Sequence, residues 1–519
     1  MINGAQSLIE SLASAGVDVC FMNPGTSEMH FVQALDAVPA MRGVLGLFEG
    51  VATGAADGYA RIAGKPAAVL LHLGPGLGNG LANLHNARRA HSPMLCVVGA
   101  HATGHVRYDA PLQSDIEAVA RTVSGWVHTS GTSRDVADDA MRALAATAFD
   151  GGQIATLVLP ADVSWDDGGL IAHARPGVPL PAVGTLAIDD AALAVVSGAQ
   201  SAILLGGAAL GERGLVAASR IANATGARLL VETFPARLEA GAGRPAIGRL
   251  AYLAEAAAQQ LDGLYSLVLA GASSPVSFFA YPEKASDLIP EGCTVVPLAR
   301  VGQDVVGALE HLAERVARDT AATLAARRTD MEVPAEPLDV NNFSIAVAAT
   351  LPDGAIVVDE ANTSGFALPP ALATAAPHTV LTLTGGSIGQ GLPVAVGAAV
   401  AAPDRPVLSL EADGSAMYTI QALWTQVREH LDVTTVIVNN SAYAILRMEL
   451  ARTGAGAAGE RSAAMLSLDD PALDFVALAT GMGMPAQRVT HADELASALR
   501  AAYLEPGPHL IEAIIPPLM

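Results

Sequence analysis

The chain has 519 residues, which at roughly 100–200 residues per domain predicts about three domains. With 51% hydrophobic and 15% charged residues, its composition excludes a disordered chain. The 51 acidic and 29 basic residues give a formal net charge of −22, which argues against nucleic-acid and anionic-membrane partners. An acidic protein that binds an anionic cofactor must therefore use backbone dipoles or a metal ion.

The N-terminus and the cysteines indicate the compartment. The first residues form an amphipathic pattern around Leu8, Ile9 and Leu12, without the basic region and long apolar core of a signal peptide. No run reaches the roughly 18 apolar residues that span a bilayer. The three cysteines show no CxxC spacing, which argues against a disulfide framework or a zinc site. We therefore expect a cytoplasmic protein with no membrane partner.

Two segments rich in Pro and polar residues, His173–Gly184 and Arg328–Asn341, are typical of linkers. They separate three predicted domains, residues 1–172, 185–327 and 342–519. In each part, short apolar runs alternate with Ala-rich stretches of helical period, as in buried parallel strands joined by crossover helices. The runs are Ala67–Leu71, Ala202–Leu205, Ser266–Leu269, Ala355–Val358 and Thr434–Val438. The predicted fold is α/β, with three successive open parallel-sheet domains.

In open parallel sheets ligands bind at the carboxyl ends of the strands, so polar residues that directly follow an apolar run are candidate site residues. In the first domain, Asn23–Glu28 (NPGTSE) and His72–Asn79 (HLGPGLGN) both follow strand-like runs. Imidazole titrates near neutrality, which makes His72 a candidate for proton transfer. A histidine at a strand end is also common as a structural group, and the residues alone leave both interpretations open.

Between these segments, Glu49 follows a run that we expect to be a strand ending at Phe48, and it begins a helix rich in small residues. A carboxylate flanked by apolar groups has its charged form disfavoured, so Glu49 is expected to stay protonated near neutrality. Taken alone, the pattern favours an ordinary acidic residue in the first turn of a helix.

The third domain contains a glycine-rich segment, Leu381–Val394 (LTLTGGSIGQGLPV), after another strand-like run. Its glycine spacing does not match GxGxxG, so a dinucleotide fingerprint is not supported. Glycines let the backbone approach a flat ligand closely, and Ile388 is the one bulky side chain among them. The alternative is a glycine-rich turn before a core helix.

The strongest pattern comes next along the chain. A predicted strand leads into the residues EADGS at 411–415, one helix follows, and a second strand ends in Asn-Asn at 439–440. A right-handed crossover makes the two strands parallel, so Asp413 and Asn440 emerge at one edge with the oxygen ligands that Mg²⁺ prefers. The two residues after Asp413 open the helix, where free N–H groups favour a diphosphate. The spacing predicts a metal-bridged diphosphate site, although either half alone fits an ordinary capping turn.

The pattern Asp413-Gly-Ser followed by Asn-Asn resembles the cofactor motif of thiamine diphosphate (ThDP) enzymes, with Ala412 where the family has a glycine. The helix that begins at Glu49 (LFEGVATGAADGYAR) resembles the family's segment with the activating glutamate. NPGTSE and HLGPGLGN resemble N-terminal segments of benzoylformate decarboxylase. The resemblance covers all three domains, and it implies pyrimidine-binding, central and diphosphate-binding domains with ThDP and Mg²⁺ as cofactors.

The resemblance also implies residue roles. Glu49 would hydrogen-bond N1′ of the aminopyrimidine and promote its imino tautomer, while His72 and Thr26 would face the substrate as catalytic residues. Ile388 would hold ThDP in its V shape. The implied Mg²⁺ ligands are the side chains of Asp413 and Asn440 and the main-chain carbonyl of Ala442. Further residues expected at the cofactor are Thr363, Ser364, Gly386, Gly414, Ser415 and Tyr443.

The substrate pocket is expected beside the helix after the metal motif, where Ile445 and Glu449 correspond to pocket residues of benzoylformate decarboxylase. A carboxylate at position 449 would disfavour a bare phenyl ring and repel a second acid group, so a substrate with a hydroxyl or an amine is favoured. The alternative is that Glu449 points to solvent. The second histidine of benzoylformate decarboxylase has no counterpart, because Val276–Tyr281 (VSFFAY) occupies that region.

These motifs are common to decarboxylases and acetolactate synthases of this shape. Synthases usually carry FAD in the middle domain, and we find no matching flavin segment here, so FAD is doubtful. We predict ThDP- and Mg²⁺-dependent non-oxidative decarboxylation of a 2-oxo acid, with carboligation as a further reaction. An acetolactate synthase-like transferase that joins two 2-oxo acids is the alternative, and a non-catalytic ThDP-fold subunit is a minor one. Because the family's half-sites lie on different subunits, we expect a homodimer or homotetramer with active sites at the interface.

Overall fold

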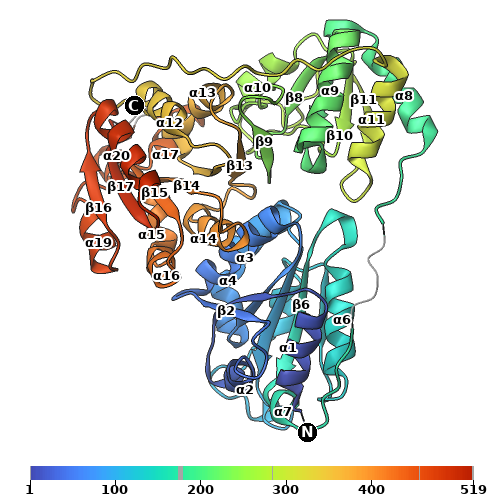
Figure 1. The fold of residues 1–519 in the computed structure, drawn as a ribbon, viewed down its shortest axis with the longest axis vertical. Coiled ribbons are helices and arrows are strands. Elements are labelled where there is room, and N and C mark those ends of the chain that lie inside the picture. The colour runs from blue at the N-terminus through green and yellow to red at the C-terminus, as the bar shows by residue number, and fades with distance from the viewer. Residues whose placement is uncertain (1, 174–178, 283, 455, 457, 517–519) are drawn as a thin grey trace.

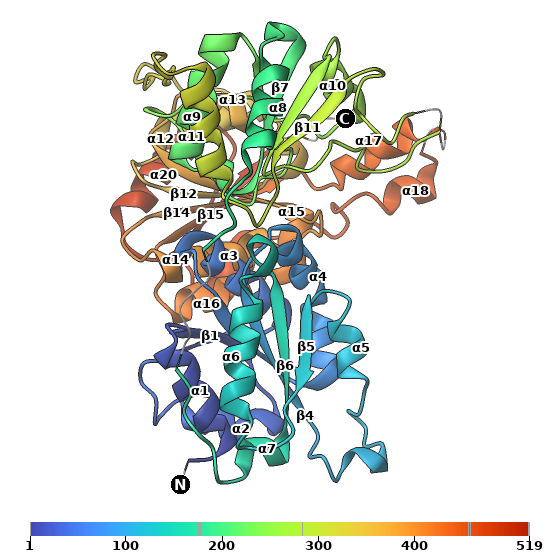
Figure 2. The same ribbon diagram turned by 90° about the vertical axis from the view of Figure 1, so that its right-hand side faces the viewer.

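The computed structural model describes residues 2–173, 179–282, 284–454, 456 and 458–516. Each third of the chain forms one sheet with helices on its faces (Figure 1). The N-terminal third occupies one end of the molecule, and the other two lie beside each other at the opposite end (Figures 1 and 2). The predicted three-domain α/β fold is confirmed. Within the described residues, we find no helix of the length and apolar character needed to cross a membrane.

The N-terminal sheet consists of β1 (Val19–Asn23), β2 (Arg42–Leu45), β3 (Ala67–Leu71), β4 (Met94–Ala100), β5 (Trp126–Thr129) and β6 (Ile154–Pro160). Its helices are α1 (Gly4–Ser14), α2 (Met29–Ala34), α3 (Glu49–Ala63), α4 (Leu73–Arg89), α5 (Ile116–Ala120), α6 (Val136–Ala146) and α7 (Ala161–Trp165). The strands are parallel in the order β2-β1-β3-β4-β6-β5. The order reverses between β1 and β3, and such a switch point is where open parallel sheets bind ligands.

The central sheet consists of β7 (Ser201–Leu205), β8 (Arg228–Val231), β10 (Ser266–Ala270) and β11 (Thr294–Ala299). Its strands are parallel in the order β11-β10-β7-β8. The surrounding helices are α8 (Thr185–Val195), α9 (Glu212–Thr225), α10 (Ala254–Leu261) and α11 (Val305–Val316). The predicted apolar runs of this part match β7 and β10 to within one residue.

The C-terminal sheet consists of β9 (Leu238–Ala240), β12 (Ile356–Glu360), β13 (His378–Thr382), β14 (Val407–Ala412), β15 (Val433–Asn439), β16 (Ala486–Val489) and β17 (His509–Ile514). Its helices are α12 (Val340–Thr350), α13 (Leu368–Leu372), α14 (Gly391–Ala401), α15 (Asp413–Thr419), α16 (Ala422–Arg428), α17 (Ala444–Arg452), α18 (Glu460–Ala464), α19 (Phe475–Gly481) and α20 (Ala492–Leu504). The order is β16-β17-β15-β14-β12-β13-β9. The direction switches between β14 and β12, so their carboxyl ends form the second ligand crevice.

One strand departs from the prediction of purely parallel sheets. β9 comes from the central part of the sequence, yet it pairs antiparallel with β13 at the edge of the C-terminal sheet. A free sheet edge exposes unpaired backbone groups, and β9 covers this one. The central part therefore shares a sheet with the C-terminal part.

The predicted linkers mark the passages between the sheets. The first, His173–Gly184, includes residues 174–178, which lie outside the described residues. In the second, Arg328–Asn341, residues 328–339 belong to a longer stretch without helix or strand, whereas Val340 and Asn341 already lie in α12. The side chain of Asp339 caps α12 by accepting the backbone N–H groups of Asn341 and Asn342, both at 2.7 Å.

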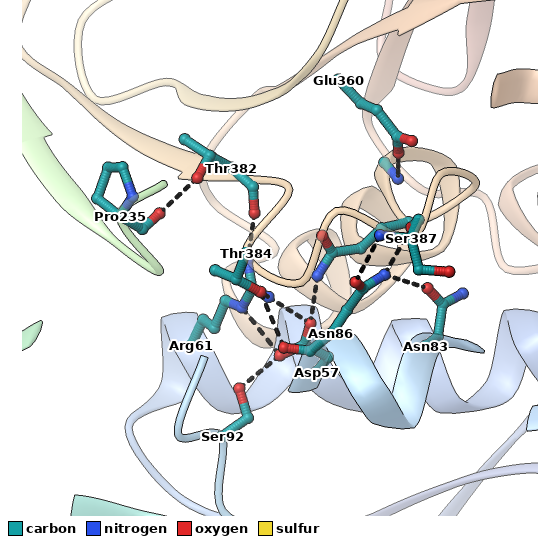
Figure 3. A network of polar contacts seen from close by, with 12 residues as sticks. Asp57, Arg61, Asn83, Asn86, Ser92, Pro235, Glu360, Thr382, Thr384 and Ser387 are labelled. Atoms are coloured by element: carbon teal, nitrogen blue, oxygen red, sulfur yellow. Dashed lines mark hydrogen bonds and ion pairs between the residues drawn. The ribbon is translucent and has the colours of Figure 1, made fainter. Parts of the chain in front are cut away.

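The N-terminal and C-terminal parts are joined by the packing of α3 against α14. Small residues allow this close approach, because a Cβ atom on Gly58 would overlap the carbonyl of Val394. A buried polar network continues the contact (Figure 3): the guanidinium of Arg61 binds both carboxylate oxygens of Asp57 and donates to Thr384 at 2.9 Å. Gln390 donates to the same carboxylate at 2.6 Å. The Ala- and Gly-rich pattern after Glu49 thus serves a helix interface between two domains.

Two local predictions were wrong. The strand before Glu49 ends at Leu45 rather than Phe48, and Phe48 instead occupies the N-cap position of α3. The single helix expected after Asp413 is broken into α15 and α16 at Ile420 and Gln421. Around this break, backbone N–H groups donate to carbonyls three residues earlier, Leu423 to Ile420 and Trp424 to Gln421, as in a 3₁₀ turn.

Candidate active site

The C-terminal switch point carries the predicted metal motif. Asp413 is the first residue of α15, at the end of β14, and Asn440 directly follows the neighbouring parallel strand β15. Both therefore emerge at one edge of the sheet, as predicted. Ala412 stands where the family motif has glycine, with φ −74° and ψ 148°. Any residue adopts this extended backbone, so the alanine causes no strain here.

Asp413 has the properties of a metal ligand. It is 2% exposed, and one of its carboxylate oxygens accepts the N–H of Gly414 at 2.8 Å. The other oxygen, Oδ2, is buried and has no hydrogen-bond partner within the described part of the chain. Burial raises the pKa of Asp413 to about 6. An unsatisfied buried oxygen is costly, and a bound cation would satisfy it.

The amide of Asn440 lies in the same buried region. Its Oδ1 accepts the N–H of Ala442 at 3.0 Å, and its Nδ2 donates to Ser364 at 3.4 Å. One carboxylate with amide and carbonyl oxygens is a donor set of the kind that Mg²⁺ binds together with phosphate. The residues present therefore fit the implied Mg²⁺ and diphosphate.

Further residues expected at the cofactor gather around Asp413. A short 3₁₀ helix, Asn362–Gly365, follows β12 and contains the buried Thr363 and Ser364. Asn362 donates to the hydroxyl of Ser415 at 2.8 Å, which links this turn to α15. The ring of Tyr443 lies against Gly414, where a Cβ atom would be 2.5 Å from the ring. The structure thus brings these predicted residues together, and it adds Asn362.

The glycine-rich loop with Ile388 is held from both domains (Figure 3). From α4, Asn86 donates to the carbonyl of Ser387 at 2.8 Å and accepts its N–H at 3.2 Å. From β12, Glu360 accepts the N–H groups of Gly389 at 2.7 Å and Gly391 at 2.5 Å. Gly386 has φ +72°, which glycine adopts readily. Ile388 is half-buried within this fixed loop.

Glu360 belongs to a buried acidic pair to which the sequence analysis gave no role. Glu360 and Glu411 are directly opposite on the parallel strands β12 and β14. Burial raises the pKa of Glu360 to about 7, and burial together with Glu360 raises the pKa of Glu411 well above its usual value. Two adjacent buried carboxyls favour retaining a proton between them. The sequence pattern conceals the pair because its members lie about 50 residues apart.

The N-terminal switch point carries the predicted catalytic residues. Glu49 begins α3 and is 7% exposed, and its carboxylate accepts a hydrogen bond of 3.0 Å from the side chain of Asn79. A Cβ atom on Gly76 would be 3.3 Å from the same carboxylate, so the glycine leaves space beside it. The HLGPGLGN segment therefore positions Glu49, a function of Asn79 and Gly76 that the sequence analysis missed.

His72 lies at this edge in a pair with Glu28. Its Nδ1 is 2.8 Å from Oε2 of Glu28, which also accepts the N–H of Gly25 at 2.8 Å. Burial raises the pKa of the Glu28 carboxyl, and the nearby His72 opposes that rise. The pair fixes the ring and leaves the other ring nitrogen for a ligand. Thr26 is exposed at the start of the 3₁₀ helix Thr26–Glu28, and we find no hydrogen bond between it and His72 in the described part of the chain.

The residues at the N-terminal switch point (Glu49 and His72) and those at the C-terminal one (Asp413 and Asn440) form two separate groups, which Asn83 connects only through backbone carbonyls. Asn83 donates to the carbonyl of Gly50, next to Glu49, at 2.8 Å, and to the carbonyl of Gly389 at 3.2 Å. In the described part of the chain, no hydrogen bond or ion pair joins Glu49 or His72 to Asp413. One chain thus carries two separate groups of candidate site residues, one at the switch point of each sheet.

The predicted pocket residues lie on α17. Ile445 is half-buried. Glu449 does not have the free carboxylate assumed from the sequence: it accepts hydrogen bonds from the hydroxyl of Tyr281 at 2.7 Å and from Arg452 at 2.6 Å. Because Arg452 compensates its charge, the expected repulsion of a phenyl ring or a second acid group no longer follows.

Two family models match the chain on either side of the central part. Residues 2–120 match the thiamine pyrophosphate enzyme N-terminal TPP binding domain, and residues 361–513 match the corresponding C-terminal TPP binding domain. The chain belongs to the thiamine pyrophosphate (ThDP) enzyme family. The resemblance inferred from Glu49, Asp413 and Asn440 is therefore confirmed at the level of the family.

Relatives cover the full length of this ThDP enzyme. It is 61% identical over 520 residues to a Mycobacterium tuberculosis protein named "Putative acetolactate synthase large subunit IlvX", with 100% of both chains covered. It is 30% identical to benzoylformate decarboxylase of Pseudomonas aeruginosa, with 97% of both covered. The structure of a ThDP-dependent 4-hydroxybenzoylformate decarboxylase from Rhodococcus jostii RHA1 matches with a TM-score of 0.85, 25% identity and 99% of both chains covered. The chain is thus an enzyme of the decarboxylase and acetolactate synthase group.

Proposed function

We propose that this enzyme uses ThDP and Mg²⁺ to decarboxylate a 2-oxo acid without oxidation, releasing CO₂ and an aldehyde. The observation that supports this reaction most is the His72–Glu28 pair at the N-terminal switch point. Release of an aldehyde requires a proton at the former keto carbon, and a histidine held by a buried carboxylate is suited to deliver it. The net reaction consumes one proton and one 2-oxo acid anion.

We assign the following roles to the residues of the site. When bound, ThDP would supply a nucleophilic carbon and an electron-accepting thiazolium for the loss of CO₂. Glu49 holds a proton at N1′ of the aminopyrimidine, with its carboxylate oriented by Asn79. Asp413, Asn440 and the carbonyl of Ala442 would hold Mg²⁺, and Ser415, Gly414, Thr363 and Ser364 would bind the diphosphate. Ile388, Gly386 and Tyr443 support the rings of the cofactor.

The second candidate is an acetolactate synthase-like transfer, in which the acyl-anion equivalent left after CO₂ release would add to the keto carbon of a second 2-oxo acid. The name of the Mycobacterium tuberculosis relative at 61% identity, a putative acetolactate synthase large subunit, favours this reaction. We propose the decarboxylase first, because the contact between His72 and the buried Glu28 supports proton delivery by this histidine, and because relatives named decarboxylases match nearly the whole chain. A non-catalytic subunit is disfavoured by the presence of Glu49, Asp413 and Asn440.

Product analysis separates the candidates. The purified enzyme with ThDP and Mg²⁺ is incubated with a panel of 2-oxo acids, and CO₂, aldehyde and ligated products are quantified. The decarboxylase predicts aldehyde equal to CO₂, whereas the synthase predicts one ligated product per CO₂ and little aldehyde. We also expect the purified enzyme to show no flavin absorbance at about 450 nm, and we expect added FAD not to raise its activity. Stoichiometric FAD with ligated product would replace our proposal by the alternative.

We further propose that the enzyme is cytoplasmic and works as a homodimer or homotetramer. The supporting observation is that one chain presents two separate residue groups at two switch points. A twofold axis that pairs the N-terminal group of each chain with the C-terminal group of the other would complete two sites at once.

A further inference from the structure

Helix α4 carries three asparagines along one face. Asn79, Asn83 and Asn86 are spaced by four and three residues, a spacing that makes side chains neighbours on an α-helix. Asn83 and Asn86 are only 3% and 0% exposed, although asparagine belongs to the residues that mostly lie at protein surfaces. We call these three residues the asparagine ladder. Its side chains bind two segments that are far apart in the sequence.

The N-terminal end of the ladder holds the start of α3. Asn79 donates to the carboxylate of Glu49 at 3.0 Å, and Asn83 donates to the carbonyl of Gly50 at 2.8 Å. A Cβ atom on Gly54, one turn further along α3, would be 3.0 Å from the amide nitrogen of Asn83, so the two helices are in close contact there. These contacts fix where α3 begins, and they therefore fix where the carboxyl of Glu49 lies.

The other end of the ladder holds the glycine-rich loop (Figure 3). Asn86 donates to the carbonyl of Ser387 at 2.8 Å and accepts the N–H of the same residue at 3.2 Å. It also donates to Oδ1 of Asn83 at 3.0 Å. Asn83 in turn donates to the carbonyl of Gly389 at 3.2 Å. Because Ile388 lies between these two bonded residues, the ladder fixes the backbone on both sides of it.

Asn83 connects the two ends, because its Nδ2 donates both to Gly50 and to Gly389. Neither carbonyl depends on Asn83 for a hydrogen bond. The hydroxyl of Thr53 also donates to the carbonyl of Gly50 at 3.3 Å, and the hydroxyl of Thr419 donates to that of Gly389 at 2.9 Å. Loss of a donor is most costly where it leaves a buried partner unsatisfied, and these threonines prevent that. The two bonds of Asn83 therefore determine position more than stability.

We propose that Asn83 is a positioning residue of the reaction, which holds the Glu49 end of α3 at a fixed place relative to the loop that carries Ile388. This inference rests on the proposed function, in which Glu49 acts on the aminopyrimidine and Ile388 supports the rings of the cofactor. In the proposed dimer, Glu49 and Ile388 of one chain belong to different sites. Asn83 then acts on both sites, on one through Glu49 and on the other through the loop.

Asn83→Ala separates positioning from a merely structural role. Calorimetry in Mg²⁺ is expected to show a loss of ThDP affinity of less than about fivefold, because Asn83 itself binds backbone carbonyls. Hydrogen–deuterium exchange at C2 of ThDP, followed by NMR on the saturated enzyme, is expected to slow about tenfold or more, because the carboxyl of Glu49 is no longer held in place. Asn83→Ser keeps one hydroxyl donor and is expected to slow exchange less. Wild-type exchange in both saturated variants would overturn the proposal, as would a larger loss in affinity than in exchange.

Asn223 supplies the matched control. It is likewise a helical asparagine that binds a distant segment, since its amide in α9 donates to the carbonyl of Ala321 at 2.8 Å and to the hydroxyl of Thr323 at 3.0 Å. It lies outside both switch-point groups, so Asn223→Ala should keep the wild-type affinity and exchange rate. Equal slowing of exchange in this variant would overturn the proposal. An enzyme whose exchange depends on Asn83, but which releases no CO₂ from any 2-oxo acid, contradicts the proposed function alone.

Heterodimers test whether Asn83 acts at both ends of the ladder. A heterodimer of Glu49→Gln and Asp413→Ala chains retains one site with both residues. Asn83→Ala is added either to the chain that gives this site Glu49 or to the chain that gives it the glycine-rich loop. We expect each placement to slow CO₂ release about threefold or more. An effect from one placement alone would show that Asn83 serves only one end, and it would overturn the proposal.

Discussion

Glu49 shows how much of the chemistry depends on a single buried carboxyl. It lies at the first position of α3, and Asn79 orients one of its oxygens. We expect Glu49→Gln to bind ThDP with nearly wild-type affinity but to slow hydrogen–deuterium exchange at C2 by about 100-fold or more, because an amide cannot supply the proton at N1′. Exchange followed by NMR measures this directly, and wild-type exchange in the variant would remove Glu49 from the mechanism.

For the metal, the corresponding prediction concerns Asp413. Among the described residues its Oδ2 is buried and accepts no hydrogen bond, so removal of the carboxylate would remove the proposed metal ligand without breaking a hydrogen bond to that oxygen. We expect Asp413→Ala to lose Mg²⁺-dependent ThDP binding, with an affinity decrease of about 100-fold, while the fold persists. Calorimetry in Mg²⁺ and in EDTA checks this. A variant whose ThDP affinity remained wild-type in Mg²⁺ would show that the metal lies elsewhere.

A half-buried carboxyl in the central part, that of Glu232, gives a pH-dependent prediction. Burial raises the pKa of Glu232, which follows β8, to about 7, and its Oε1 accepts the N–H of Gly207 at 3.1 Å. A folded-state pKa above the unfolded value stabilises the fold at low pH, and this stability is lost as the pH rises toward 7 and beyond. At pH 8 the loss is at most about 3 kcal/mol.

Replacement by glutamine should remove that dependence, since an amide keeps the acceptor but cannot ionise. Glu232→Gln is expected to unfold at higher urea concentration than the wild type at pH 8 and at nearly the same concentration near pH 4.5. Urea unfolding followed by circular dichroism at both values measures the difference. A variant that is equally or less stable at pH 8 would show that Glu232 is charged in the fold at no cost.

At the scale of elements, the close contact between α3 and α14 depends on a glycine, which has no Cβ atom. A Cβ atom on Gly58 would overlap the carbonyl of Val394, whereas one on Gly78, in the exposed part of α4, would meet nothing within 4 Å. Gly58→Ala should therefore lower the free energy of unfolding by about 1–3 kcal/mol. Gly78→Ala should be neutral or slightly stabilising, because alanine favours a helix. Equal melting temperatures for the two variants would contradict close packing at Gly58.

The same scale shows what sequence reasoning could and could not predict. Buried parallel strands are continuous apolar runs, so β3, β7 and β10 were predicted to within one residue. The break between α15 and α16 was missed because the apolar period continues through it. β9 was missed because three residues have no period, and its place is set by the free edge of β13.

For the site, local motifs predicted the residues but not their partners. Asp413 and Asn440 could be placed together because parallel strands share an edge. The partner of His72 is Glu28, 44 residues away, and the partner of Glu449 is Tyr281, 168 residues away. Such pairs depend on tertiary packing, and without them the charge state that a side chain presents to a ligand cannot be deduced.

At the scale of the whole molecule, we propose that two chains complete each ThDP site. Each chain carries the Glu49 group at one switch point and the Asp413 group at another, without a bond between them among the described residues. If the cofactor lies between the groups of different chains, an isologous dimer contains two complete sites. Mutations in the two groups should then complement each other when placed on different chains.

The most direct test mixes Glu49→Gln with Asp413→Ala subunits after each has been shown to be inactive. A reassociated heterodimer contains one site with both residues intact and one with both replaced, so we predict activity of about half the wild-type value per heterodimer. Tagged subunits and tandem purification verify the heterodimer, and CO₂ release measures the activity. Verified heterodimers that stay as inactive as either parent would contradict a ThDP site shared between chains.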